Sequence, residues 1–263
     1  MRTFFSKPMC QRGAVVWLIF CCPLLPVQSA TGAEAVQEDV KAQEIFAKAD
    51  HIRFPAEGFQ VDVIITTTAP DAEPDERAYQ ILSKGNNQTL VQTTAPAIDR
   101  NQILLMRDHD LWAYLPNLSQ PVRLPLSQRL TGQVANGDLA RANFVGDYEP
   151  RILRQDKIDG ETYYVLQLDA IEQWVTYRRV LYWVNARNSR PFMAEFYAVS
   201  GRLLKTCRYQ EYKPLGGEAR PTRLVIEDAL RPDHQSVLQY SNMVLRNLPD
   251  KLFTKDQLKR IAR

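Results

Sequence analysis

Cysteine is scarce in this sequence of 263 residues, and its placement limits what can hold the fold together. Three of the four cysteines, Cys10, Cys21 and Cys22, lie within the first 33 residues. Beyond them Cys207 stands alone and cannot form an internal disulfide, so an apolar core must stabilise the fold. Because Cys207 lies in a strand-like run, we interpret it as a small buried residue and not as a nucleophile.

Excess charge of either sign is also missing from most of the chain. Residues 1–33 contain Arg2, Lys7 and Arg12 and no acidic residue, which leaves 30 of the 33 basic residues against 30 acidic ones. A neutral domain exerts no general attraction on polyphosphate, so nucleic acid is not an expected partner. With 45% hydrophobic and 24% charged residues, the composition is typical of a globular protein.

Recognisable catalytic motifs are lacking as well. The three histidines, His51, His109 and His234, lie in turns or just after a predicted helix. Asp108 and Asp110 flank His109 and could hold a metal, but adjacent residues rarely converge on one ion without help from elsewhere. The chain has no His-Glu-x-x-His or Gly-x-Ser-x-Gly motif and no phosphate-binding glycine loop. We therefore expect no enzymatic activity, no cofactor and no metal.

The first 33 residues have the layout of a secretory signal peptide. A basic head precedes an apolar run of 13 residues, Gly13–Leu25, and small residues follow. The competing interpretation is a transmembrane anchor, but a span needs about 20 apolar residues, and this run is shorter and ends in Pro23 and Pro26. We therefore expect export from the cytoplasm.

Small residues near the end of this segment place the expected cleavage between Ser29 and Ala33. A lipoprotein signal would put a small residue directly before the acceptor cysteine, and neither Cys21 nor Cys22 has one, so lipidation is not expected. No repeat or linker divides the rest of the sequence. Residues 34–263 are predicted to form a single domain.

Alternation of apolar and polar residues dominates from residue 59 onwards and predicts strands. In Phe59–Thr68 it places Val61, Val63 and Ile65 on one side. The other predicted strands span residues 78–82, 89–93, 103–107, 110–115, 151–158, 162–169, 178–185, 192–199, 203–212, 222–228 and 236–245, with a further short one at 122–124. Their hairpin-length connections predict an antiparallel meander.

Helices are predicted at both ends of this sheet and within one interruption. Apolar residues lie near one face of 36–49, and Thr254 can cap a last helix. Two short helical patterns occur at 126–130 and 138–144. The predicted fold class is mainly β with flanking helices (α+β), built on one strongly curved antiparallel sheet of about 11 strands. Such a sheet either closes on itself or leaves its concave face partly uncovered.

Residues 116–150 interrupt the strands with a dense mixture of arginine, aspartate, asparagine and glutamine. One interpretation is a surface excursion whose charges are solvated. The other is a hydrogen-bonded plug or helical lid at the mouth of the sheet, in which arginines donate charge-assisted bonds to aspartates or backbone carbonyls. The candidate polar network consists of Arg123, Arg129, Asp138, Arg141 and Asp147.

Several motifs in and around this block resemble one known family. They are Trp112–Pro116, Arg123, Ser127–Arg129, Asn136–Asp138, Gly146–Tyr148 and the closing Leu248–Thr254. Together they are similar to the outer-membrane lipoprotein-sorting family, which is related to the periplasmic lipoprotein carrier LolA. The resemblance implies an incomplete antiparallel β-barrel of the LolA/LolB kind, covered by helices, with an apolar cavity for acyl chains. It also implies residence in a Gram-negative periplasm.

The apolar side chains of the predicted strands are the candidates for this cavity. The residues chosen are Val61, Val63, Ile65, Leu105, Trp112, Tyr114, Leu166, Leu181 and Trp183. A slip of one residue in register would exchange the two sides of a strand, so the choice of side stays open.

Three functions are left open by the sequence. The first is a monomeric carrier or binder whose partners are a lipid or an acylated lipoprotein, with an inner-membrane exporter as a further partner. The second is an envelope sensor or accessory interaction module for a membrane exporter, using the same fold. The third, and weakest, is a small hydrolase.

Overall fold

The computed structural model describes residues 31–85, 87–116, 118–141 and 143–261. Most of the predicted signal peptide, residues 1–30, lies outside the described residues. Within the described ranges the helices are α1 (Thr31–Arg53), η1 (Ala97–Asp99), α2 (Asn136–Ala140), η2 (Asp250–Phe253) and α3 (Lys255–Ile261). The first eight strands are β1 (Phe59–Thr68), β2 (Asp75–Lys84), β3 (Gln88–Ala95), β4 (Ile103–Arg107), β5 (Asp110–Tyr114), β6 (Val122–Leu124), β7 (Arg129–Thr131) and β8 (Val134–Ala135). The last seven are β9 (Tyr148–Ile158), β10 (Glu161–Ala170), β11 (Arg179–Asn185), β12 (Pro191–Tyr197), β13 (Leu203–Leu215), β14 (Glu218–Asp228) and β15 (Gln235–Leu245).

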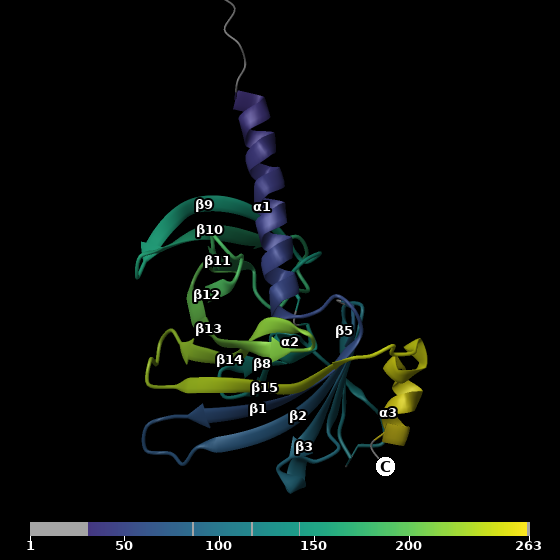
Figure 1. Cartoon of the computed structure of the whole chain (residues 1–263). Coiled ribbons are helices and arrows are strands. Elements are labelled where there is room, and N and C mark those ends of the chain that lie inside the picture. The colour runs from purple at the N-terminus through teal and green to yellow at the C-terminus, as the bar shows by residue number, and fades with distance from the viewer. Residues whose placement is uncertain (1–30, 86, 117, 142, 262–263) are drawn as a thin grey trace, which may run out of the picture.

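Thirteen of these strands form one antiparallel sheet in the order β6-β5-β4-β3-β2-β1-β15-β14-β13-β12-β11-β10-β9. The sheet curls strongly but does not close, because β6 and β9 remain as its two edges (Figure 1). The strands β7 and β8 form a separate hairpin. The chain from β6 to β9 therefore connects one edge of the open sheet to the other.

The predicted number of about 11 strands is wrong, because the described residues contain fifteen. Two of the additional strands are very short: β7 has three residues and β8 has two. Segments of that length are too short to show alternation. The predicted helical pattern at 126–130 is also wrong, since residues 129–131 form β7 and the described helix begins at Asn136.

Helix α1 defines which face of the sheet is the inner one. It buries Ala42, Phe46 and Ala49, which are spaced along one face of a helix, and it packs against β9, β12 and β14. Phe46 and Ala49 join one large apolar cluster with Val63 of β1 and Leu166 of β10. We call the side of the sheet that faces α1 the inner face. In Figure 1 the amino-terminal part of α1 extends beyond the sheet.

The outer face of the sheet is also partly covered. Leu90 and Leu105 lie there in a second cluster, together with Phe253 of η2 and Leu258 of α3. The predicted last helix is present as α3. The hydroxyl of Thr254, which was expected to cap this helix, donates instead to the backbone carbonyl of Lys251 at 3.1 Å. No helix in the described ranges has the length and apolar character needed to cross a bilayer.

Candidate functional site

The structure separates the predicted cavity residues into three groups. Val61, Val63, Ile65 and Leu166 lie together in the inner cluster. The remaining five residues lie in two clusters on the outer face: Leu105, Trp112 and Tyr114 beneath η2 and α3, and Leu181 and Trp183 beside Tyr163 and Val165. The nine residues therefore do not form one surface.

This separation arises because, on three of the strands, the residues that face inwards lie one position away from the predicted ones. Leu166 pairs with Tyr182, so Tyr182 shares its inner side while its neighbours Leu181 and Trp183 point outwards. On β4 and β5 the paired residues Leu104 and Ala113 take the inner side in the same way. For Leu105, Trp112, Tyr114, Leu181 and Trp183, the structure corrects the predicted side of the strand.

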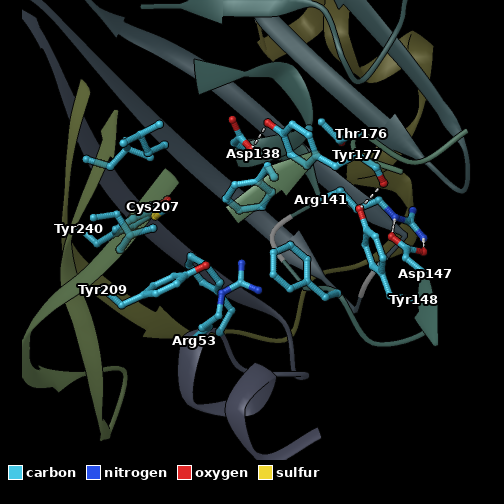
Figure 2. A pocket seen from close by; sticks show the side chains of 17 residues that line it. Arg53, Asp138, Arg141, Asp147, Tyr148, Thr176, Tyr177, Cys207, Tyr209 and Tyr240 are labelled. Carbon is cyan, nitrogen blue, oxygen red and sulfur yellow. Dashed lines mark hydrogen bonds and ion pairs between the residues drawn. The ribbon is translucent and has the colours of Figure 1, made fainter. Parts of the chain in front are cut away.

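A small buried cavity lies in the middle of the inner face (Figure 2). Its lining includes Arg53, Phe144, Tyr177, Phe196, Cys207, Tyr209 and Tyr240. Its volume is about 40 Å³, well below the roughly 150 Å³ of a cavity that can hold benzene. The protein's own aromatic side chains therefore fill this part of the interior.

Arg53 and Asp50 place an ion pair inside this aromatic cluster. The guanidinium of Arg53 lies 3.8 Å from the ring centre of Phe144, and Figure 2 shows it pointing from α1 into the cavity. Its Nη1 donates to Asp50 Oδ1 at 3.1 Å. Asp50 also accepts the backbone N–H groups of Phe144 at 3.0 Å and Val145 at 2.9 Å. Burial raises the pKa of Asp50, although Arg53 and these two N–H groups act to lower it.

Helix α2 is held by a second charge, on Asp138, whose side chain is 13% exposed. This carboxylate accepts hydrogen bonds from Tyr177 Oη at 2.8 Å and from the backbone of Ala135 at 2.7 Å. It also forms an ion pair with Lys205, whose Nζ lies 5.0 Å from the ring centre of Tyr177. Gly137 packs closely on the neighbouring loop, since a Cβ there would lie 1.9 Å from Thr176 Oγ1. Any side chain at this position would push the two elements apart.

A third buried ion pair joins Arg141 to Asp147. Arg141 Nη1 also donates to the backbone carbonyl of Asp108 at 2.9 Å, which ties the end of α2 to the turn between β4 and β5. Trp174 covers the same guanidinium at 4.5 Å. The start of β9 is thereby fastened to the rest of the inner site.

The β7–β8 hairpin is attached to the rim of the sheet by its turn. The backbone N–H of Gln133 donates to Ser236 Oγ at 3.0 Å, and Thr131 donates to Asp75 at 3.3 Å. Gly132 has a φ of +49°, and a Cβ there would lie 2.2 Å from Thr67 Oγ1, so both conformation and space require glycine. We use the term closing segment for residues 126–141 and 143–147, which comprise this hairpin, α2 and the stretch before β9.

Of the predicted polar network, Asp138, Arg141 and Asp147 lie in buried ion pairs of the closing segment. Arg123 instead pairs with Asp110 on the exposed surface. Arg129 is exposed and forms no ion pair within the described part of the chain. The charged groups at the candidate site therefore come partly from the closing segment and partly from other elements.

Sequence reasoning missed Asp50, Arg53, Tyr177 and Lys205. Asp50 and Arg53 follow the predicted end of the first helix at residue 49, and charged residues are usually assigned to solvent. A signal was present, because Asp50 and Arg53 continue the spacing of three and four residues that Phe46 begins.

A larger apolar hollow lies on the inner face beside the closing segment. It has a volume of about 250 Å³. We call it the apolar recess, and its apolar walls include Val91, Leu104, Leu115, Val122, Leu124 and Leu130. Val122 is 37% exposed, so the recess opens to the surface. It adjoins α2 through Asn136.

The three histidines lie in separate parts of the chain, one on α1 and two in turns between strands. His51 faces Glu218 at 3.4 Å, His234 faces Asp233 at 3.0 Å, and the His109 ring lies 3.7 Å from that of Trp174. The described residues contain no group of three or more histidine, cysteine, aspartate or glutamate side chains positioned to hold a metal ion.

The comparisons with known proteins include a relative of high sequence identity. It is a LolA superfamily protein from Nitrosomonas europaea, with 60% identity and a TM-score of 0.79, and the match covers 82% of this chain and 98% of that one. A family model described only as "Uncharacterized protein" matches residues 85–260. A search of curated proteins found no match.

Two more distant structures share the fold. One is a DUF1329 family protein from Desulfovibrio piger, with 18% identity, a TM-score of 0.73 and coverage of 84% of this chain and 99% of that one. The other, from Vibrio parahaemolyticus, is a domain named for outer membrane lipoprotein sorting, with 21% identity, a TM-score of 0.73 and coverage of 84% and 100%. The match at 60% identity over most of both chains, with the shared open sheet, shows that this chain belongs to the LolA superfamily.

Proposed function

We propose that this protein binds the acyl chains of a lipid or an acylated lipoprotein in the periplasm and acts there as a carrier. Membership of the LolA superfamily supports the proposal, and one structure of the same fold is named for outer membrane lipoprotein sorting. The predicted signal peptide supports the location, and an inner-membrane exporter would be a donor of the cargo.

The observation that carries this proposal is the apolar recess beside the closing segment. An apolar cavity of about 150 Å³ is large enough to hold benzene, and the recess has a volume of about 250 Å³. It can therefore accept a segment of alkyl chain without rearrangement. Each buried methylene would contribute about 0.8 kcal/mol of transfer free energy.

Longer chains require the closing segment to move. The central cavity holds only about 40 Å³, and the side chains that fill it include Phe144 of that segment. The segment is held by ion pairs and hydrogen bonds to α1, β13 and the sheet rim, which can exchange for contacts with water. We infer that loading opens these contacts and extends the recess into the central cavity.

Binding of a fluorescent fatty-acyl probe tests the proposal, together with mass spectrometry of organic extracts from the purified protein. Val91 lines the recess and is 1% exposed, so Val91→Thr places a hydroxyl against the bound chain. The probe affinity should fall about tenfold, since burying an unpaired hydroxyl costs about 1–3 kcal/mol.

Val165→Thr is the matched control, because Val165 is 0% exposed but belongs to the outer cluster. Both variants should lose similar stability in urea, while only Val91→Thr loses probe affinity. If wild-type protein neither binds the probe nor carries extractable lipid, the proposed function is wrong.

We further propose that this role is binding without catalysis. The prediction concerns His51 on α1, His109 in the turn between β4 and β5, and His234 in the turn between β14 and β15. Changing each to alanine should leave acyl-probe binding within a factor of about two, because a change below 0.5 kcal/mol is typical of such surface sites. A variant that folds normally but has lost binding or cargo transfer would contradict this.

A further inference from the structure

A second open hollow lies on the other side of the β7–β8 hairpin from the apolar recess. Its volume is about 410 Å³. We call it the arginine groove, because its lining includes Arg129, Arg202 and Arg231. Lys205 and Asp228 also contribute to its walls.

Two of the four cations in this groove already have a carboxylate partner. Lys205 pairs with Asp138, and Arg231 pairs with Asp228 at 3.2 Å. Arg129 and Arg202 are both exposed, and among the described residues neither has a carboxylate within 4.0 Å. The groove therefore presents two uncompensated guanidinium groups, which are suited to a phosphate or carboxylate.

The groove and the recess meet at Arg129, which lines both of them. Leu130, the next residue, lines the recess, whereas Gly132 and Gln133 line the groove. An apolar hollow and a cationic hollow thus adjoin across one short hairpin. A molecule with an alkyl tail and an anionic head would match both at once.

We propose that the ligand is an anionic amphiphile, with its acyl chain in the apolar recess and its phosphate or carboxylate head at Arg129 and Arg202. This inference rests on the proposed function and narrows it to one class of lipid. Arg129 lies at the boundary between the two hollows, where the acyl chain would leave the recess and the anionic head would enter the groove. The Arg231–Asp228 pair fixes the loop that forms the far wall.

The test compares two lysolipids that share one acyl chain: lysophosphatidylglycerol, which is anionic, and lysophosphatidylcholine, which is zwitterionic. Titration calorimetry on the purified protein should show tighter binding of the anionic lipid. In the double variant Arg129→Gln/Arg202→Gln, affinity for the anionic lipid should fall about tenfold. Affinity for the zwitterionic lipid, whose phosphate is offset by its choline cation, should fall much less.

Two control variants separate the head site from the tail site. Arg151→Gln/Arg187→Gln changes the net charge by the same amount at exposed arginines outside the groove and should keep the anionic preference. Val122→Asp, in the recess, should weaken both lipids alike. Val244→Asp should weaken neither, since Val244 is 54% exposed and lies outside the recess.

Each outcome decides between the two proposals. Equal binding of both lysolipids by wild-type protein, or an unchanged preference in the arginine double variant, would overturn the anionic-head inference and leave acyl binding intact. Failure of both lysolipids to bind would overturn the proposed function. Binding of inorganic phosphate as tightly as the anionic lysolipid would reduce the groove to a site for free anions.

Discussion

Arg53 brings a permanent positive charge into the aromatic interior, where it pairs with the Asp50 carboxylate. Removing one partner of such a pair leaves the other charge buried. We expect Arg53→Met to lower the free energy of unfolding by about 3–5 kcal/mol. Asp50→Asn/Arg53→Met should recover part of that loss, and urea denaturation of the three proteins measures both effects. Equal stability of the single and double variants would contradict the coupling.

The pH dependence of the same variants follows from the raised pKa of Asp50, for which burial is the largest cause. The unfolded carboxyl loses its proton near pH 3.8 and the folded one at higher pH, so this group stabilises the fold most at acid pH. That contribution is lost as pH rises through the folded pKa. Arg53→Met removes a group that lowers the pKa of Asp50. The stability of this variant should therefore fall more steeply towards neutral pH than that of the wild-type protein.

Cys207 reports whether the central cavity is closed. Burial raises its pKa to about 12, so at neutral pH the thiolate is almost absent and the thiol lies out of reach of reagents. Iodoacetamide labelling of Cys207, followed by peptide mass spectrometry, should be slow in the folded protein and fast in urea. Addition of an acyl ligand that opens the closing segment should raise the labelling rate. Rapid labelling of the free folded protein would show that the cavity is open.

At the scale of elements, Gly137 tests how tightly the closing segment is docked. Gly137→Ala places a Cβ 1.9 Å from Thr176 Oγ1 and should lower stability by about 1–3 kcal/mol as α2 is displaced. Thr176→Ala in the same chain removes the clashing hydroxyl and should restore part of the loss. Amide exchange across the closing segment should accelerate in the single variant. Fast exchange of the whole segment in wild-type protein would contradict a docked element.

The turn between β14 and β15 is organised by Asp228. Burial alone would raise the pKa of this carboxyl, but hydrogen bonds from Leu230 and Arg231 lower it below 3.8. A lowered folded pKa stabilises the turn above the unfolded pKa, and that stability is lost as pH falls through the folded value. Titration of the side-chain carbonyl by NMR should give a pKa below 3.8. Asp228→Asn should abolish this part of the acid sensitivity.

Most strands could be predicted because alternation is strong where one side of a strand is more polar than the other. The predicted bounds of β1 and β4 agree with the structure. The closing segment was harder, because α2 has only five residues and it is positioned by contacts with distant elements. Asp138, for example, meets Lys205 from β13, and no local pattern in the sequence contains that pairing.

At the scale of the whole molecule, the sequence could not predict which side of each strand faces inwards. Leu104, Leu105 and Met106 are apolar in succession, because inner and outer clusters both need apolar residues. Trp112 and Tyr114 flank the small Ala113, and size alone suggests that the aromatic pair faces the core. In the structure Ala113 faces inwards, and the aromatic residues face outwards towards η2 and α3.

The pairing of β1 with β15 differs from the other strand pairings of the thirteen-stranded sheet, because it joins residues that are distant in the sequence. Every other neighbouring pair in the thirteen-stranded order joins strands that follow each other in the chain, whereas Phe59 pairs with Leu245. Local hairpins form early, and contacts between distant residues carry a larger entropic cost of loop closure. The two runs of hairpins, β1 to β6 and β9 to β15, can therefore assemble separately, and the β1–β15 seam joins them last. Until β15 has paired, the edge of β1 stays free, and this edge is where a chaperone or a second chain would pair with it.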